Sequence, residues 1–223
     1  MGQTAQWIKP PLRKSQFYPE LNHVELTRAQ GASCSKNCDM IKKRELPLAQ
    51  VYGLLEPGPV VLVTTARAGR ANIMTMSWQT MMEFDPPLVG CVISNRNYSF
   101  ETLQVTKECV INIPTVELAE KVVACGNASG RRVDKFKTLG LTPADAAKVK
   151  APLIAECYAN LECKVVDRKL VAKYNFFVLE VVKAWIDPRR KRPRTIHHQG
   201  EGVFMVAGRT LHLPSPITSL TRK

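Results

Sequence analysis

The sequence predicts a mainly β fold, an antiparallel barrel or sandwich with a few short helices between the strands. Short runs rich in β-branched residues recur along the chain, and several alternate apolar and polar side chains. Turns rich in Gly and Pro separate these runs. We expect about six to eight strands, which favours an antiparallel fold over a doubly wound parallel sheet.

The elements are assigned from these patterns in chain order. Strands are expected at 60–65, 72–80, 88–94, 109–114, 159–166, 174–186, 203–207 and 209–213. Helices are expected at 47–55, from Ser99 onward, at 116–125, at 133–140, and as one turn within 142–149. Thr115 is expected to cap the helix that Gly126 stops, and Ser99 to be an N-cap.

Composition restricts the class of protein. The 223 residues are 45% hydrophobic and 23% charged, as in soluble globular domains, and no apolar run is long enough to cross a bilayer. No secretory signal is visible at the start, so we expect a cytoplasmic protein whose seven cysteines are free thiols. Cys91, Cys109 and Cys163 lie in apolar or alternating runs and are expected in the core.

The net charge of +13 raises the question of nucleic-acid binding, but its distribution argues against it. Residues 1–45 carry +4, residues 46–188 carry +2 and residues 189–223 carry +7, so the central region is nearly neutral. The basic run at 189–194 is preceded by Pro188 and interrupted by Pro193, and it contains no aromatic residue that could stack on a base. We interpret it as a solvated loop.

Two basic loops are candidate anion sites. In "SNRNYSFETL", Arg96 precedes a helix start at Ser99, where free backbone amides favour an anion. In "SGRRVDKF", two arginines and Lys135 form a second cationic segment. The structural alternatives are an ordinary cap with a surface arginine in the first loop, and solvated cations with a local Asp134–Arg131 pair in the second.

The segment "NIMTMSWQT", residues 72–80, places small polar side chains on one face and large apolar ones on the other. Thr75 and Ser77 would let a flat heteroaromatic ligand approach the strand, with Met74, Met76 and Trp78 packed behind it or with Trp78 flanking the ligand. A half-exposed strand with its polar face in water is the alternative, and the pattern alone favours that alternative.

The sequence gives little support for a metal site or for a catalytic side chain. His197 and His198 are adjacent and would point to opposite faces of a strand, so we predict no metal site there. Cys34 and Cys38 lack a second pair of ligands, which leaves zinc a weak option. No dinucleotide fingerprint and no nucleophile elbow occur, and we assign no catalytic side chain.

Taken in order, "PGPVVLVTT", "GRANIMTMSWQT", "DPPLVGCVIS", "SFETL", "ECVINIP", "SGRRVDKF" and "FFVLEVV" resemble the flavin reductase-like, FMN-binding split-barrel family, most closely its flavoredoxin type. The resemblance implies a six-stranded antiparallel split β-barrel with Greek-key character in residues 46–213, an N-terminal extension at 1–45 and a C-terminal tail at 214–223. It also implies a homodimer with FMN bound near the interface.

The resemblance also implies a set of FMN-binding residues. Arg96 and Ser99 would hold the phosphate, and Lys135 would reach the phosphate or the ribityl chain. The other expected contacts are Asn72, Met74, Thr75, Met76, Ser77, Trp78, Tyr174, Asn175 and Phe204. Some relatives have a histidine where Tyr174 or Asn175 falls, and an aromatic residue over the ring where Phe204 falls.

The activity implied is an NAD(P)H-dependent flavin reductase, with NADH or NADPH as co-substrate and a flavin, a ferric chelate or a protein as electron acceptor. Two alternatives stay open. One is a flavoredoxin-like carrier that a partner protein reduces, and the other is a non-catalytic basic adaptor.

Overall fold

The structure of this chain is a computed structural model, and it describes residues 58–210. The predicted extension at 1–45, the helix at 47–55, the tail at 214–223, and Cys34 and Cys38 lie outside these residues. So does most of the strand expected at 209–213.

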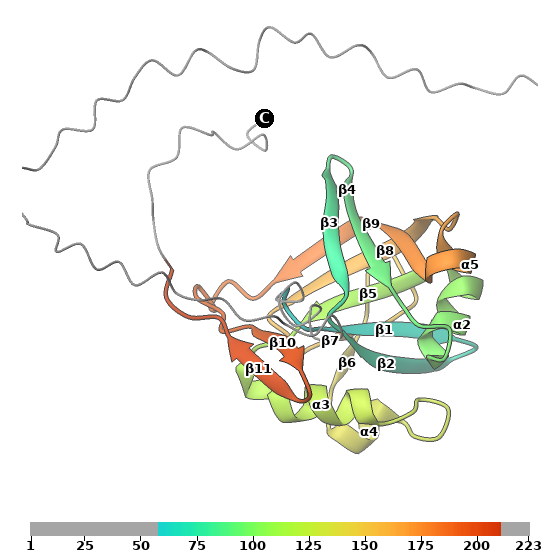
Figure 1. Ribbon diagram of the computed structural model, residues 1–223. Coiled ribbons are helices and arrows are strands. Elements are labelled where there is room, and N and C mark those ends of the chain that lie inside the picture. Colours follow the sequence, from blue (N-terminus) through green and yellow to red (C-terminus); the bar gives the residue numbers. More distant parts are fainter. Residues whose placement is uncertain (1–57, 211–223) are drawn as a thin grey trace, which may run out of the picture. The chain divides into compact units, whose positions relative to one another are not determined.

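Seven strands form one curved antiparallel sheet in the order β2-β1-β5-β8-β9-β4-β3 (Figure 1). This architecture confirms the mainly β, antiparallel split-barrel prediction. The strands are β1 (Val61–Arg67), β2 (Arg70–Met76), β3 (Gln79–Phe84), β4 (Pro87–Val92), β5 (Glu108–Ile113), β8 (Ala159–Asp167) and β9 (Phe176–Ile186).

The segment expected as one strand at 72–80 is two strands that lie at opposite edges of the sheet. β2 pairs with β1, whereas β3 pairs with β4, and the chain changes direction at Ser77 and Trp78. The Gln79 side chain donates to the carbonyl oxygen of Pro59, 2.5 Å away, and ties the start of β3 to the chain just before β1. The main sheet therefore has seven strands where six were expected, and within the described part of the chain no strand pairs with the outer edge of β2.

Short helices and two small sheets complete the described chain. The helices are α2 (Tyr98–Thr106), the 3₁₀ turn η2 (Val116–Leu118), α3 (Ala119–Asn127), α4 (Lys135–Leu139) and α5 (Val171–Tyr174). The small sheets pair β6 (Pro143–Ala144) with β7 (Leu153–Ile154), and β10 (Ile196–Gly200) with β11 (Val203–Val206). Among residues 58–210, no helix is long and apolar enough to cross a membrane.

Several local expectations were wrong in detail. The N-cap of α2 is Asn97, and Ser99 lies inside the first turn. Thr115 is the N-cap residue of η2, as expected, but its hydroxyl donates to the carboxylate of Glu117 and does not cap the backbone, while the following helix continues through Gly126. No helix forms within 142–149, where β6 pairs with β7. The predicted end of the short helix at Gly140, which has a positive φ, is confirmed.

The sheet is apolar on both faces. Inside the barrel, Met74 and Met76 pack with the thiols of Cys91, Cys109 and Cys163, which confirms the expectation that these cysteines are core residues. Outside it, Leu62 and Ile73 pack against α3, α4 and β10. The run at 189–194 is the loop between β9 and β10, in which Arg189 pairs with Asp187 and Arg190 with Glu117.

One buried carboxylate fixes the loop after α4 to the sheet. Glu162 of β8 accepts hydrogen bonds from the backbone amides of Ala147 (3.0 Å) and Lys148 (2.5 Å) and from the indole of Trp185 (2.7 Å). Burial alone would raise the pKa of Glu162, but these donors outweigh it and the pKa lies below its ordinary value. The ionised carboxylate therefore stabilises the folded chain.

We expect Glu162→Gln to lower the free energy of unfolding at pH 7 by about 2 kcal/mol, as for lost hydrogen bonds to a charged group. Because the folded pKa is depressed, the contribution is complete above the unfolded pKa of about 4.3 and is lost as the pH falls through the folded value. Urea unfolding at pH 7 and below pH ~4 measures this, with Glu201→Gln at the exposed hairpin tip as control. A stability difference that persists at low pH would contradict the assignment.

Candidate functional site

Two hollows lie on either side of the C-terminal end of β2. The helix-side hollow, about 340 Å³, is lined by Val60, Thr75, Met76, Ser77, Val122, Val123, Gly126, Asn127, His198, Gly202 and Phe204. The loop-side hollow, about 320 Å³, is lined by Met74, Thr75, Met76, Ser77, Trp78, Val92, Ser94, Asn97 and Asn175. Thr75, Met76 and Ser77 belong to both, so this segment separates one hollow from the other.

Helix α3 forms the wall of the helix-side hollow because its C-terminal half is fixed to β2. The hydroxyl of Thr75 donates to the carbonyl oxygen of Val122 at 2.7 Å. Gly126 faces Thr75 so closely that a Cβ added there would lie 3.5 Å from the threonine Cβ. The Thr75 side chain thus faces α3, and its hydroxyl already has a protein acceptor.

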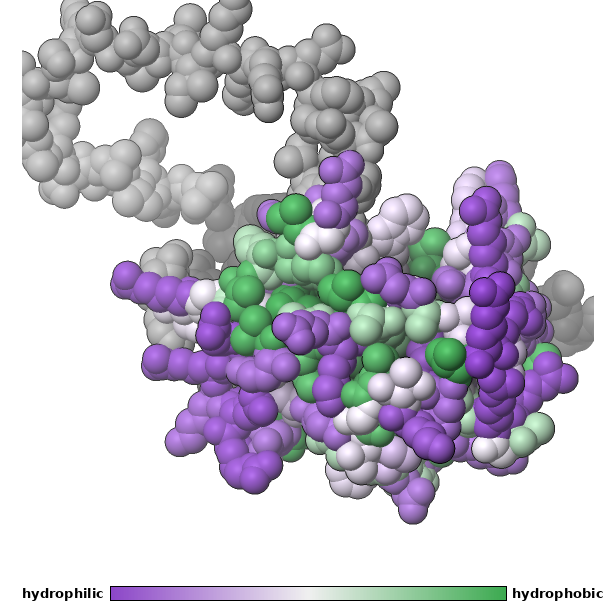
Figure 2. Space-filling model, turned by 90° about the horizontal axis from the view of Figure 1, so that it is seen from below, coloured by the Kyte–Doolittle hydropathy of each residue, from purple (hydrophilic) through white to green (hydrophobic). Residues whose placement is uncertain are grey.

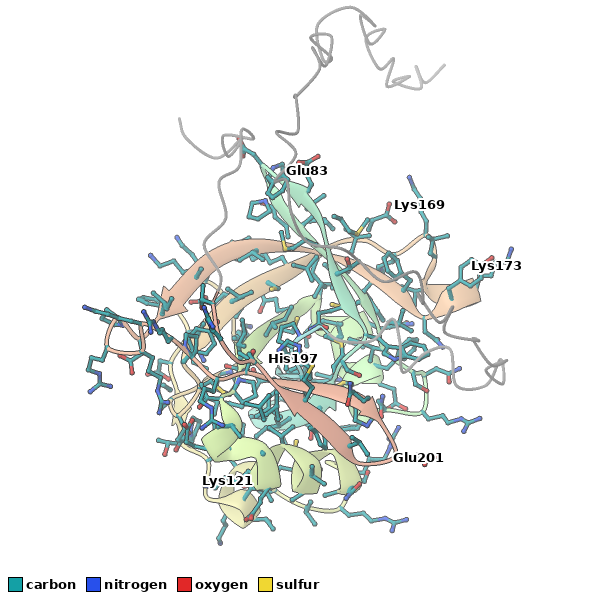
Figure 3. The ribbon with its side chains drawn as sticks, turned by 60° about the vertical axis from the view of Figure 1, so that its left-hand side comes forward. Glu83, Lys121, Lys169, Lys173, His197 and Glu201 are labelled. Carbon is teal, nitrogen blue, oxygen red and sulfur yellow. The ribbon has the colours of Figure 1, made fainter. Side chains whose placement is uncertain are left out.

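The β10–β11 hairpin forms the opposite wall. In Figure 3, His197 lies on this hairpin over the sheet and Glu201 marks its tip. The rings of His198 and Phe204 are 5.1 Å apart across the hairpin, and both residues line the hollow. Seen from below, the side of α3 and α4, hydrophobic side chains gather on part of the surface and hydrophilic ones border them (Figure 2).

The start of α2 lies beside the loop-side hollow, which Ser94 and Asn97 line. The backbone amides of Tyr98 and Ser99 have no acceptor within the helix, and no side chain caps this end. The amide of Asn72, 5% exposed, donates to the hydroxyl of Ser99 at 2.8 Å, while Oδ1 of Asn72 has no partner among the described residues. This helix start therefore combines free donors with a buried polar group from β2.

The second cationic loop reaches the same helix through Arg131, which lies beside Arg70 of β2. The guanidinium groups of Arg131 and Arg70 lie 5.3 and 5.6 Å from the ring centre of Tyr98, and Arg70 also donates to the carbonyl oxygen of Gly130 at 2.6 Å. Arg131 pairs with Glu101 in the first turn of α2, and this hydrogen bond lowers the pKa of that carboxyl group. Asp134 caps α4 and does not pair with Arg131.

Lys135 is not part of the lining of either hollow. Its ammonium is buried and donates to the carbonyl oxygens of Ile73 at 2.8 Å and Cys125 at 2.7 Å. Burial lowers the pKa of Lys135, and the Cys125 side chain partly opposes the shift. The residue therefore joins β2 to the end of α3, and a direct phosphate contact would require these two hydrogen bonds to break.

The sequence model of the flavin reductase like domain matches residues 54–203. The chain belongs to the flavin reductase-like family. Residues 58–210 hold most of the matched segment, including β2, α2, α3 and β10, and the match ends at the first residue of β11.

Individual members of the family are similar at moderate identity. An uncharacterized protein of Archaeoglobus fulgidus is 36% identical over 113 residues, 51% of this chain and 64% of that protein, so the chain spans slightly less than two thirds of it. The crystal structure of an FMN-binding domain of a flavin reductases-like enzyme from Shewanella baltica matches with a TM-score of 0.66 and 27% identity over 76% of this chain and 96% of that one. The flavoredoxin of Desulfovibrio vulgaris has the same fold, with a TM-score of 0.66 and 23% identity over 78% of this chain and 94% of that one.

The structure brings together most of the residues that the family resemblance selected. Those lining a hollow are Met74, Thr75, Met76, Ser77, Trp78, Asn175 and Phe204. Asn72 and Ser99 are paired beneath the start of α2, and Arg96 is exposed in the loop before it. Tyr174 was expected in a strand but ends α5, where it is exposed with the Lys173 ammonium 5.1 Å from its ring centre. Tyr174 and Lys135 line neither hollow.

Sequence reasoning missed the α3 side of the site. Val122, Gly126 and Asn127 line a hollow because α3 packs on β2, a contact about 50 residues apart in sequence that no local pattern reveals. His198 was considered for metal binding alone, although its strand position beside Phe204 places it in the lining of the helix-side hollow. Among residues 58–210, no group of three or more His, Cys, Asp or Glu side chains is placed to hold a metal ion.

Proposed function

We propose that this family member binds FMN along the open edge of β2 and acts as an NAD(P)H-dependent flavin reductase. The observation that carries the proposal is the segment Thr75–Ser77, which two hollows share and which leads to the open start of α2. A flavin nucleotide has a flat ring at one end and a phosphate at the other, so it needs a cavity at a strand edge joined to an anion site.

The residues present fit such a ligand. Each hollow has a volume within the range of small-molecule sites, and the two adjoin. Apolar lining from Met76, Val122 and Phe204 suits a ring, while Thr75 and Ser77 leave the backbone accessible. At the other end, the amides of Tyr98 and Ser99 with the side chain of Arg96 would hold the phosphate.

Bound FMN would supply the redox chemistry, taking a hydride from NADH or NADPH and passing two electrons to a flavin, a ferric chelate or a protein acceptor. The chain's own part is to bind, orient and exclude water. Outward-facing amides at the β2 edge would donate to the side of the ring where negative charge grows. His198 and Phe204 would cover the cavity from the hairpin, and no acid–base side chain is assigned.

We expect Arg96→Ala to weaken FMN binding by about 1.5–3 kcal/mol, because the phosphate loses a charge-assisted hydrogen bond. Isothermal titration of the apoprotein with FMN measures the loss. Arg168→Ala is the matched control, since Arg168 donates to Gln104 near the other end of α2. Equal affinities for the two variants would place the phosphate away from Arg96.

Anaerobic mixing of the FMN-loaded protein with NADH or NADPH tests the reductase activity. We expect the oxidised flavin absorbance to bleach, with rates that rise with nicotinamide concentration. If neither nucleotide reduces the bound flavin and a partner protein does, the protein is an electron carrier and the reductase assignment is overturned. A colourless protein that takes up no FMN would favour the adaptor.

A homodimer, which the family resemblance implies, is part of the proposal. The β3–β4 hairpin projects from the sheet (Figure 1), and β3 is an edge strand with Met81 56% and Phe84 64% exposed. Exposed apolar side chains on an open edge favour pairing with another chain. We propose that a second copy of this chain pairs with the exposed edge of β3.

Sedimentation equilibrium tests this pairing. We expect twice the mass of one chain for the wild type and the mass of a single chain for Met81→Lys/Phe84→Lys. Val166→Lys, which changes an exposed apolar side chain of β8, is the control and should stay dimeric. A wild-type protein with the mass of one chain would refute the dimer.

We further propose a cytoplasmic location, in which the five described cysteines remain the buried free thiols of the structure. Cell fractionation with a specific antibody tests it, and recovery from an oxidising compartment would contradict it.

A further inference from the structure

We propose that the buried ammonium of Lys135 raises the reduction potential of the bound flavin. The lysine would do so as a fixed charge at the edge of β2, without contacting the flavin phosphate. This inference rests on the proposed FMN site. It assigns to Lys135 an electrostatic role that follows from where the side chain ends.

The position of the ammonium is defined by the carbonyl that it contacts. Among residues 58–210, β2 pairs with β1 alone and its other edge has no strand partner, and the carbonyl oxygen of Ile73 accepts from Lys135 at 2.8 Å. Residues two apart in a strand direct their backbone groups to the same edge. Thr75 therefore presents its backbone to the edge that Lys135 occupies, about 7 Å further along the strand.

A second contact places the charge beside the wall of the helix-side hollow. Lys135 donates to the carbonyl oxygen of Cys125, in the last turn of α3, and the next residue, Gly126, lines the hollow. The negative end of the helix dipole stabilises a cation at this point. The ammonium thus contacts both β2 and the end of α3, the two elements that the hydrogen bond from Thr75 to Val122 also joins.

The charge is not cancelled by its neighbours. The Cys125 sulfur lies 3.9 Å from the ammonium, but burial raises the pKa of this thiol, so it remains neutral. The lining of the two hollows contains no Lys or Arg within the described part of the chain. Lys135 therefore places a positive charge next to a cavity whose lining contains no Lys or Arg side chain.

Such a charge acts on reduction because reduction changes the charge of the ring. Uptake of a hydride from the nicotinamide nucleotide adds two electrons and one proton, and the ring gains one negative charge. A buried cation at this strand edge favours that state over the oxidised one, since low-dielectric surroundings screen it weakly. Reduced FMN should therefore bind more tightly than oxidised FMN, and Lys135 supplies part of that difference.

The experiment compares midpoint potentials of the full chain loaded with FMN, measured by anaerobic equilibration with redox dyes, together with the affinity for oxidised FMN. For Lys135→Gln we expect the preference for reduced over oxidised FMN to fall about tenfold, which is about 30 mV for a two-electron couple. Lys135→Arg should retain the wild-type potential. The control Lys121→Gln removes an α3 lysine that donates to the Gly140 carbonyl at the surface and should leave the potential unchanged.

A second pair of variants keeps Lys135 in place, in case its loss prevents folding. Cys125→Asp introduces a carboxylate beside the ammonium and should lower the potential, whereas Cys125→Ser should not. An unchanged potential in Lys135→Gln or in Cys125→Asp, with FMN bound, would overturn this inference alone. An equal shift in Lys135→Arg would also overturn it, because geometry and not charge would then be the cause. A wild-type chain that binds no FMN would overturn the proposed function itself.

Discussion

The open edge of β2 is the constraint on which the site depends. An edge strand in a curved sheet leaves a row of backbone groups without strand partners, and those groups must find other acceptors and donors. Here the first part of the edge is satisfied from within the protein, since Lys135 donates to Ile73. The following part, Thr75–Ser77, borders two hollows. The same edge is thus closed by protein at one end and accessible to a ligand at the other.

Burying the Lys135 ammonium at the Ile73 end of the β2 edge costs free energy, which neighbouring groups offset. A lysine ammonium is expensive to bury unless it is paired with acceptors. Lys135 finds them in the carbonyl of Ile73 and in that of Cys125, which the end of α3 leaves without an intrahelical donor. One side chain therefore satisfies an edge strand and a helix terminus together. The hydroxyl of Thr75, bonded to Val122, repeats this link one turn earlier in α3.

Much of the fold could be predicted from the sequence because strand periodicity is local. The β-branched run that became β1 and the alternation in β5 and β8 depend on neighbouring residues alone. The break at Ser77 and Trp78 could not be predicted, since the polar and apolar alternation continues across it. Its cause is tertiary, because β2 pairs with β1 and β3 with β4. The contact of Thr75 with α3 could not be predicted either, because its acceptor, Val122, is distant in the sequence.

The site shows the same division between local and long-range information. The basic loop at Arg96 and the helix start at Tyr98 lie in one short segment, and a sequence pattern finds them together. Lys135 was selected for its charge, yet its function depends on Ile73 and Cys125, which local spacing does not connect. Charge near a cofactor can act by contact or through a field, and the two require different positions. Because Lys135 already donates to both carbonyl oxygens, its position suits an effect on the flavin through the electric field of its charge.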